Sequence, residues 1–149
     1  MPQEYFMRAA LEEAQKAFEK GEVPIGAVLV KDQEVIARAH NLKEERRDPT
    51  AHAEILVIQE ASRILKSWRL AGTTLYVTIE PCPMCAGALI QARVGKLVFG
   101  ARDVKAGTCG SLYNLVQDSR FNHCIKVEEG ILKDSCAEIM QRFFKERRK

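Results

Sequence analysis

The chain has 149 residues, of which 46% are hydrophobic and 29% are charged, and its net charge at pH 7 is +3. A chain of this length is expected to form one domain, residues 1–149, with a hydrophobic core of its own. No apolar run approaches the ~20 residues that cross a bilayer, and the N-terminus lacks the basic start and apolar stretch of a secretory signal, so membrane and secreted proteins are disfavoured.

The hydrophobic pattern predicts alternating helices and short strands. The first half should contain an amphipathic helix over about residues 3–20, a strand hairpin at 25–30 and 35–39, a polar loop at 41–50 and a helix over about 53–66. The second half should contain a strand at 75–79, a helix beginning at Pro83, a strand at 96–101, a weakly patterned stretch at 102–123, a possible strand at 124–127 and a helix over about 132–147. This order predicts an α/β fold, a three-layer α/β/α sandwich around a central five-stranded mixed sheet.

Two short motifs carry the candidate chemistry, His52-Ala53-Glu54 and Pro81-Cys82-Pro83-Met84-Cys85. One imidazole and two thiolates, from His52, Cys82 and Cys85, are ligands typical of Zn²⁺. A structural zinc site normally has four protein ligands, whereas three leave a position for a catalytic water. Glu54 lies two residues after the histidine and is therefore placed to move the proton of that water.

Both motifs lie at predicted helix N-termini. Residues three apart on a helix share a face, so that one ion can meet the sulfurs of both Cys82 and Cys85. A helix N-terminus also carries partial positive charge and free amide donors, which favour a thiolate over a thiol. We therefore expect two helix starts to face each other across the metal, each reached directly from a strand end.

Other interpretations of these residues remain open. A single Cys-x-x-Cys also occurs in redox motifs and in half of a zinc knuckle. Cys109 could supply a fourth ligand and close the site. The five cysteines are an odd number in a chain without an export signal, so they are expected to be reduced, and the motifs leave Cys109, Cys124 and Cys136 without an assigned role.

Basic residues cluster just before the metal histidine and at the end of the chain. The first cluster is Lys43, Arg46 and Arg47, and the chain ends Phe143-Phe144-Lys145-Glu146-Arg147-Arg148-Lys149. Two interpretations stay open for both clusters: solvated surface, or contacts to the phosphates of a nucleic acid that flank the site.

The whole chain resembles the bacterial tRNA-specific adenosine deaminases of the cytidine deaminase superfamily. The zinc motifs match the superfamily signature, and narrower matches select the tRNA branch: Gly21-Glu22-Val23-Pro24-Ile25-Gly26-Ala27, His40-Asn41, Asp48-Pro49-Thr50-Ala51-His52-Ala53-Glu54, Gly100-Ala101-Arg102-Asp103, Gly110-Ser111-Leu112, Asn122-His123 and Phe143-Phe144. The resemblance implies a cytidine deaminase-like fold and hydrolytic conversion of adenosine to inosine at the wobble position of a tRNA anticodon. It also implies one Zn²⁺ per subunit, a cytoplasmic location, an anticodon stem-loop as partner, and a homodimer in which the partner subunit contributes residues near each site.

The resemblance further suggests residues that contact the RNA. Asn41 should hydrogen-bond the purine ring, and Ile25 should line the pocket, although it is nearly as well explained as strand core. Asp103 should lie near the nucleotide 5′ of the target, or else cap its own loop. Phe144 should stack on a flanking base and Arg147 should meet a phosphate, or they are helix core and solvated tail.

Three competing functions remain open. The nearest is a deaminase of a free base or nucleoside, of guanine or cytosine type, which would share the zinc motifs completely. The second is a zinc-stabilised RNA-binding module without catalysis, which does not explain the position of Glu54. The third is a redox protein, which leaves the His-x-Glu motif unexplained.

Overall fold

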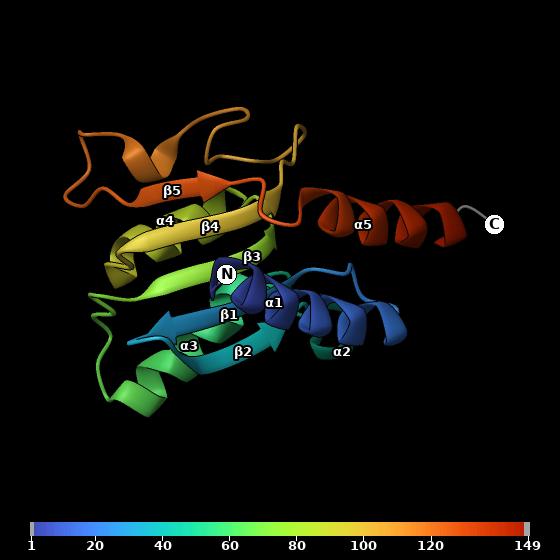
Figure 1. The fold of residues 1–149 in the computed structure, drawn as a ribbon, viewed down its shortest axis with the longest axis horizontal. Helices are drawn as coiled ribbons and strands as arrows, with labels where there is room; N and C mark the ends of the chain where they lie inside the picture. Colours follow the sequence, from blue (N-terminus) through green and yellow to red (C-terminus); the bar gives the residue numbers. More distant parts are fainter. Residues whose placement is uncertain (1, 148–149) are drawn as a thin grey trace.

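The computed structural model describes residues 2–147 as one mixed sheet with helices on both faces (Figure 1). The elements are α1 (Pro2–Glu19), β1 (Gly26–Lys31), β2 (Glu34–His40), α2 (Lys43–Arg46), α3 (Ala53–Leu65), β3 (Thr74–Ile79), α4 (Pro83–Ala92), β4 (Lys96–Ala101), the 3₁₀ turn η1 (Leu115–Gln117), β5 (Lys126–Glu129) and α5 (Lys133–Arg147).

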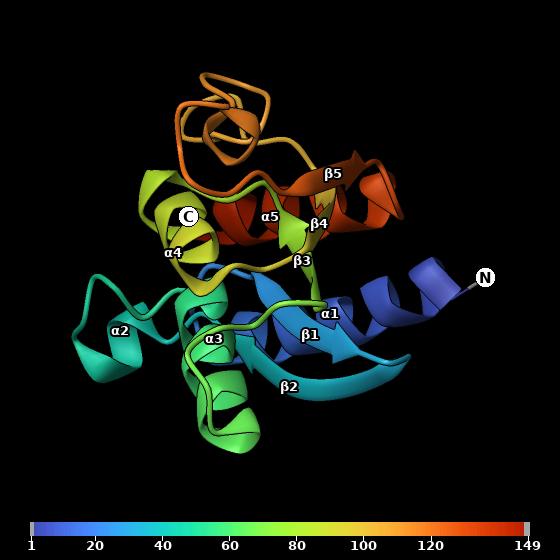
Figure 2. The same cartoon turned by 90° about the vertical axis from the view of Figure 1, so that its left-hand side faces the viewer.

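The five strands are ordered β2-β1-β3-β4-β5. Strand β1 pairs antiparallel with both β2 and β3, whereas β3, β4 and β5 run parallel. Helices α1 and α5 cover one face of the sheet, and α3 and α4 cover the other (Figure 2). The predicted three-layer α/β/α sandwich with a five-stranded mixed sheet is confirmed.

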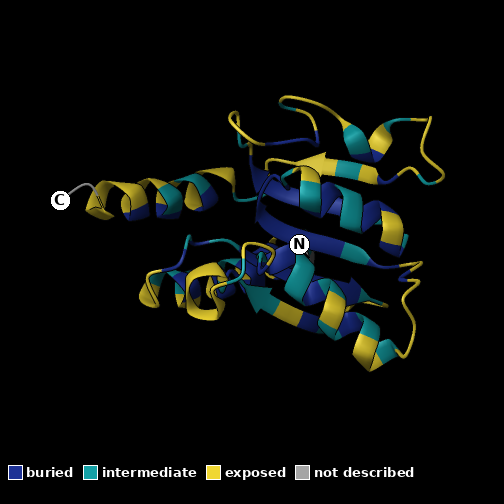
Figure 3. Ribbon diagram, turned by 180° about the vertical axis from the view of Figure 1, so that it is seen from behind, coloured by how far each residue is buried: buried dark blue, intermediate teal, exposed yellow. Residues whose placement is uncertain are grey.

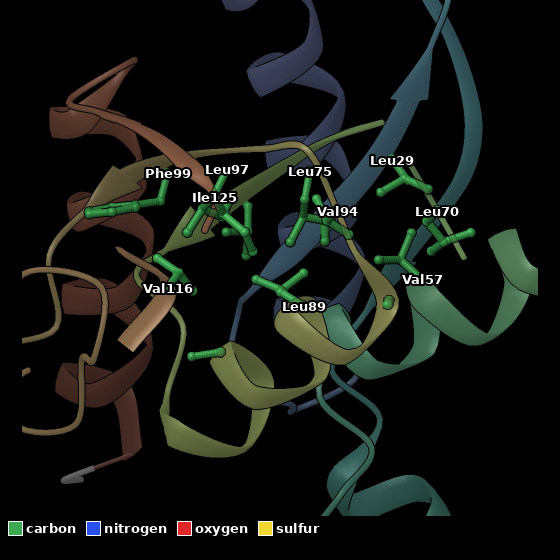
Figure 4. Packing of buried hydrophobic residues seen from close by; sticks show 14 of the residues in the cluster. Leu29, Val57, Leu70, Leu75, Leu89, Val94, Leu97, Phe99, Val116 and Ile125 are labelled. Atoms are coloured by element: carbon green, nitrogen blue, oxygen red, sulfur yellow. The ribbon is translucent and has the colours of Figure 1, made fainter. Parts of the chain in front are cut away.

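The three central strands are buried along nearly their whole length, while the edge strands β2 and β5 are partly exposed (Figure 3). A strand covered on both faces needs a continuous apolar run, which is why these strands were visible in the sequence. Two hydrophobic clusters result, one on each face, and the larger lies under α3 and α4 (Figure 4). Its members include Leu29, Val57, Leu75, Leu89, Leu97 and Phe99.

The long terminal helices each place an apolar stripe on the same face of the sheet. Phe6, Met7 and Ala10 of α1 are buried there, as is Cys136 of α5, and Met140 of α5 packs against the same cluster. Such a stripe at helical spacing is typical of a helix that packs on a core. None of the helices described between residues 2 and 147 is long and apolar enough to cross a membrane.

The structure differs from the sequence prediction in the loops and at one edge. The expected polar loop at 41–50 contains the four-residue helix α2, which is too short to show a hydrophobic period. The last strand is β5 at Lys126–Glu129, two residues later than the predicted 124–127, because the backbone before it bonds to η1 through Ile125 N–H and the Val116 carbonyl. Ile25 precedes β1 and does not pair within it.

The predicted hairpin between β1 and β2 closes through a two-residue turn. Lys31 pairs with Glu34, and the turn residues Asp32 and Gln33 have φ angles of 51° and 64°. Two positive φ angles are characteristic of the type I′ turn, whose twist matches that of the strands. The turn lacks the Asn-Gly or Asp-Gly sequence that usually marks a type I′ turn. The hairpin was therefore predicted from its flanking strands and not from the turn residues.

Candidate functional site

The three candidate metal ligands lie at two neighbouring helix N-termini. His52 is the N-cap of α3, and Cys82 is the N-cap of α4, both with extended backbone. Pro83 occupies the first position of α4, where its missing N–H is not needed. Cys85 lies one turn further along the same helix, so that its sulfur and that of Cys82 face the same side. The predicted arrangement of two facing helix starts is confirmed.

The donor atoms of these side chains form one compact cluster. His52 Nδ1 lies 3.7 Å from Cys82 Sγ and 3.6 Å from Cys85 Sγ. Among the residues that the structure describes, this is the one group of three or more metal-binding side chains whose donor atoms lie within 4.8 Å of one another. Cys109 is buried outside the cluster, so a fourth ligand from this residue is not supported.

The side chains of the cluster shift one another's pKa values. A hydrogen bond from Cys85, together with one from His52, lowers the pKa of Cys82 to about 4 despite partial burial. The same interactions raise the pKa of His52 and of Cys85. An imidazole and two cysteine sulfurs form a donor set that favours a soft or borderline metal ion.

Glu54 lies in the first turn of α3, beside the cluster, and only 3% of its surface is exposed. Its Oε1 is buried and has no hydrogen-bond partner among the described residues. Burial raises the pKa of this carboxyl to about 7. A group with a pKa near neutrality both takes up and releases protons, which suits a general acid and base.

Two adjoining pockets form a groove beside the cluster. The first, of about 240 Å³, is lined by His52 and by Ile25, Asn41, Phe144 and Arg147. The second, of about 550 Å³, shares Val23, Ile25 and Phe144 with the first and adds the loop that contains Asp103. The structure therefore brings all five candidate RNA-contacting residues to one continuous surface that leads to the histidine.

Asn41 is buried, and its side chain accepts a hydrogen bond from the backbone of α3. The Ala53 N–H donates to Asn41 Oδ1 over 2.8 Å and so satisfies one of the free amides at the start of the helix. With the oxygen engaged in this way, the Nδ2 amide is the end of the side chain that remains to bind a ligand. The contact also ties the position of Asn41 to that of the adjacent His52, a candidate metal ligand.

The other candidates combine a local contact with a place in the groove. Asp103 Oδ1 accepts hydrogen bonds from Lys105 N–H and Ala106 N–H, both over 3.1 Å, so it does cap its own loop. Arg147 donates to the Gly21 carbonyl over 3.2 Å, while the neighbouring Phe144 is 45% exposed. The exposed ring is not helix core, and the end of α5 is anchored beside the groove.

Sequence reasoning missed two buried glutamates that hold the loops of the groove. Glu22 is 1% exposed and accepts hydrogen bonds from Glu44 N–H and Glu45 N–H at the start of α2. Glu80 is 3% exposed and binds the backbone of the loop that follows β4. For Glu80 the signal available was an acidic residue directly after an apolar strand, where a buried carboxylate requires hydrogen-bond partners.

Comparison with known proteins gives consistent matches over the whole chain. Residues 1–148 match the family model of the MafB19-like deaminases. The chain is 58% identical to the tRNA-specific adenosine deaminase of Bacillus subtilis over 146 residues, covering 98% of this chain and 91% of that protein.

Solved structures show the same fold. A tRNA:A34 deaminase, studied for A-to-I editing at the wobble position of transfer RNA, superimposes with a TM-score of 0.88 at 47% identity, covering 91% of this chain and 98% of that one. A guanine deaminase from Nitrosomonas europaea superimposes with a TM-score of 0.80 at 25% identity, covering 94% and 83%.

Proposed function

This chain belongs to the tRNA-specific adenosine deaminases, and we propose that His52, Cys82 and Cys85 hold the zinc ion with which it converts wobble adenosine to inosine. The observation that carries this function is the 58% identity over 98% of the chain. It is joined by a cluster in which one imidazole and two thiols meet beside a buried carboxyl.

The geometry of the cluster supports zinc. Bond lengths of about 2.3 Å to sulfur and 2.0–2.1 Å to nitrogen, at the tetrahedral angle, separate the two donors by about 3.6 Å. The observed distances from His52 Nδ1 to the sulfurs, 3.6 and 3.7 Å, agree with this value. When bound, zinc lowers the pKa of a coordinated water from 15.7 to roughly 7 and so supplies a nucleophile at neutral pH.

Glu54 is the proton carrier of the proposed reaction. Its carboxylate takes the proton of the attacking water and delivers it to N1 of adenine as the oxygen bonds to C6. It then takes the remaining proton from the new hydroxyl on C6 and delivers it to the 6-amino group, which leaves as ammonia when the C6–N bond breaks and the C6 oxygen becomes a carbonyl. One buried carboxyl can perform both transfers because no described residue holds its Oε1 in another hydrogen bond.

The groove supports a binding mode for the anticodon loop. Asn41 donates its Nδ2 amide to the purine ring, and Ile25 packs against the flipped base at the junction of the two pockets. Asp103 faces the nucleotide on the 5′ side, Phe144 stacks on a flanking base, and Arg147 meets a phosphate. Unpaired loop bases reach such a pocket without the cost of opening a duplex.

Incubation with an in vitro transcribed tRNA that carries adenosine at the wobble position tests this function. We expect an A-to-G change at that position on sequencing, together with release of ammonia. Because a guanine deaminase shares the fold, guanine, cytidine and free adenosine are assayed in parallel. Faster ammonia release from guanine or cytidine than from the tRNA would contradict the assignment and favour a free-base or nucleoside deaminase.

The chain is also proposed to act as a homodimer, with one zinc ion in each single-domain subunit. Several large apolar side chains lie at the surface of the described residues, including Ile64 and Trp68 near the end of α3, which are 43% and 61% exposed. Burying such side chains between two copies would be favourable. Light scattering should give about twice the monomer mass of 16.8 kDa; the monomer mass at assay concentration would contradict the dimer.

The cytoplasmic location expected from the sequence is consistent with a tRNA substrate and stays a prediction.

A further inference from the structure

A buried carboxylate connects the metal-binding segment to the far side of the groove. Glu80 follows β3 directly and comes two residues before the ligand Cys82. Its own N–H donates to the Ala101 carbonyl at the end of β4 over 2.9 Å. The side chain therefore starts from a fixed point on the central sheet and is held inside the protein.

The backbone that surrounds this carboxylate belongs to the loop at 102–111. Glu80 Oε1 accepts from Asp103 N–H over 3.1 Å, and Oε2 accepts from Cys109 N–H and Ser111 N–H, each over 2.9 Å. The Ser111 hydroxyl donates a fourth hydrogen bond to Oε1. Within this loop the described secondary structure is limited to one isolated bridge at Cys109. Hydrogen bonds to one carboxylate thus take the place of a strand or helix.

The fit of the loop around the carboxylate leaves no space. A Cβ atom on Gly107 would come within 2.5 Å of both Glu80 Oε1 and the Asp103 carbonyl. The Thr108 N–H donates to the carbonyl of Pro81, the residue that follows Glu80, over 3.0 Å. The loop is therefore bound to the segment that also supplies a metal ligand.

Every hydrogen bond described for the Glu80 side chain comes from a donor of this loop, three from backbone N–H groups and one from the Ser111 hydroxyl. Charge-assisted hydrogen bonds are roughly twice as strong as neutral ones. Replacement by a neutral amide should loosen the loop, because an amide nitrogen would face backbone donors.

We propose that Glu80 is a positioning residue, which holds Asp103 at the edge of the groove and so sets the binding of the nucleotide beside the target adenosine. This inference rests on the proposed function, because it takes the groove to be the RNA site. Asp103 and its neighbours Val104 and Lys105 line the pocket that also contains Ile25 and Phe144. The carboxylate itself is buried and acts through the backbone of the loop.

The test is steady-state kinetics of Glu80→Gln with a wobble-adenosine tRNA, together with zinc analysis. We expect KM to rise about tenfold, while kcat and the zinc content change little, because the chemistry at Glu54 is untouched. Asp103→Ala provides a double-mutant cycle: if Glu80 acts through Asp103, the effect of Glu80→Gln should be much smaller in that background. The matched control is Glu13→Gln, which neutralises another buried carboxylate that binds Lys16, Arg38 and His40 away from the groove. It should leave KM unchanged.

Two results would overturn the inference while leaving the function intact. In the first, the wild type is active on the tRNA and Glu80→Gln has the same KM. In the second, Glu80→Gln loses zinc and its kcat falls in parallel, which indicates that Glu80 supports the metal-binding segment alone. If Glu80→Gln does not fold, Ser111→Ala removes only the hydroxyl donor and should raise KM about threefold; an unchanged KM there also overturns the inference. A wild type without tRNA activity would instead contradict the proposed function itself.

Discussion

Replacing Glu54 by alanine should lower kcat on a wobble-adenosine tRNA by about 10²- to 10⁴-fold, the range typical of a lost general acid and base. The zinc content should stay at one per subunit, because the carboxyl is not one of the clustered donors. The folded protein should be as stable as the wild type or more so, since the substitution removes a buried carboxyl oxygen without a hydrogen-bond partner.

The control for Glu54→Ala is Glu60→Ala on the same helix. The Glu60 side chain is 42% exposed and pairs with Arg63 one turn later, so its loss should leave kcat unchanged. Metal analysis, thermal unfolding and single-turnover kinetics on both variants separate catalysis from metal binding and folding. A Glu54→Ala enzyme with wild-type turnover would exclude the proton-carrier role.

Replacing Gly26 by alanine should destabilise the protein by at least about 3 kcal/mol, the upper end of the cost of overpacking a core. Helix α1 crosses β1 here, and the added Cβ would collide with the backbone of Ala10 and Ala14 and lie 2.7 Å from Glu13 Cβ. Backbone cannot move aside as a flexible side chain can, so the helix must shift from the sheet. Because β1 pairs on both sides, the shift should affect the whole central sheet.

Gly87→Ala is the matched control, because it adds the same methyl group where nothing lies within 4 Å. Gly87 lies inside α4, and alanine should stabilise a helix interior by about 0.5–1 kcal/mol. Urea unfolding followed by circular dichroism measures both variants. A loss below about 1 kcal/mol for Gly26→Ala would mean that α1 does not pack on β1 as closely as described.

Short-range features of the sequence were sufficient to predict most of the fold and the candidate metal cluster. The continuous apolar runs of β1, β3 and β4 identified the central strands because burial on both faces leaves no polar alternation. The candidate ligands could be identified because Cys82 and Cys85 are three residues apart at a helix start. His52 and Glu54 are likewise only two residues apart, so their spacing is visible in the sequence.

Long-range contacts explain what the sequence reasoning missed. Helix α2 begins where Glu22 binds two of its amides, a contact across more than twenty residues of chain that leaves no periodic pattern. Strand β5 is an edge strand with one pairing partner, and its start depends on where the preceding loop meets η1. The partners of Glu80 lie in the loop at 102–111, more than twenty residues away in the chain, so the sequence alone does not show that its carboxylate is bound there.

The residues proposed to perform the chemistry, and the sheet on which they rest, could therefore be predicted from the sequence itself, because ligand type, spacing and hydrophobic period act over a few residues. Only the tertiary structure decided that Asn41, Asp103 and Phe144 share one groove and that Cys109 stays outside the metal cluster. Those relations join segments far apart in the chain. They depend on how the helices pack on the two faces of the sheet and on which buried polar groups find partners there.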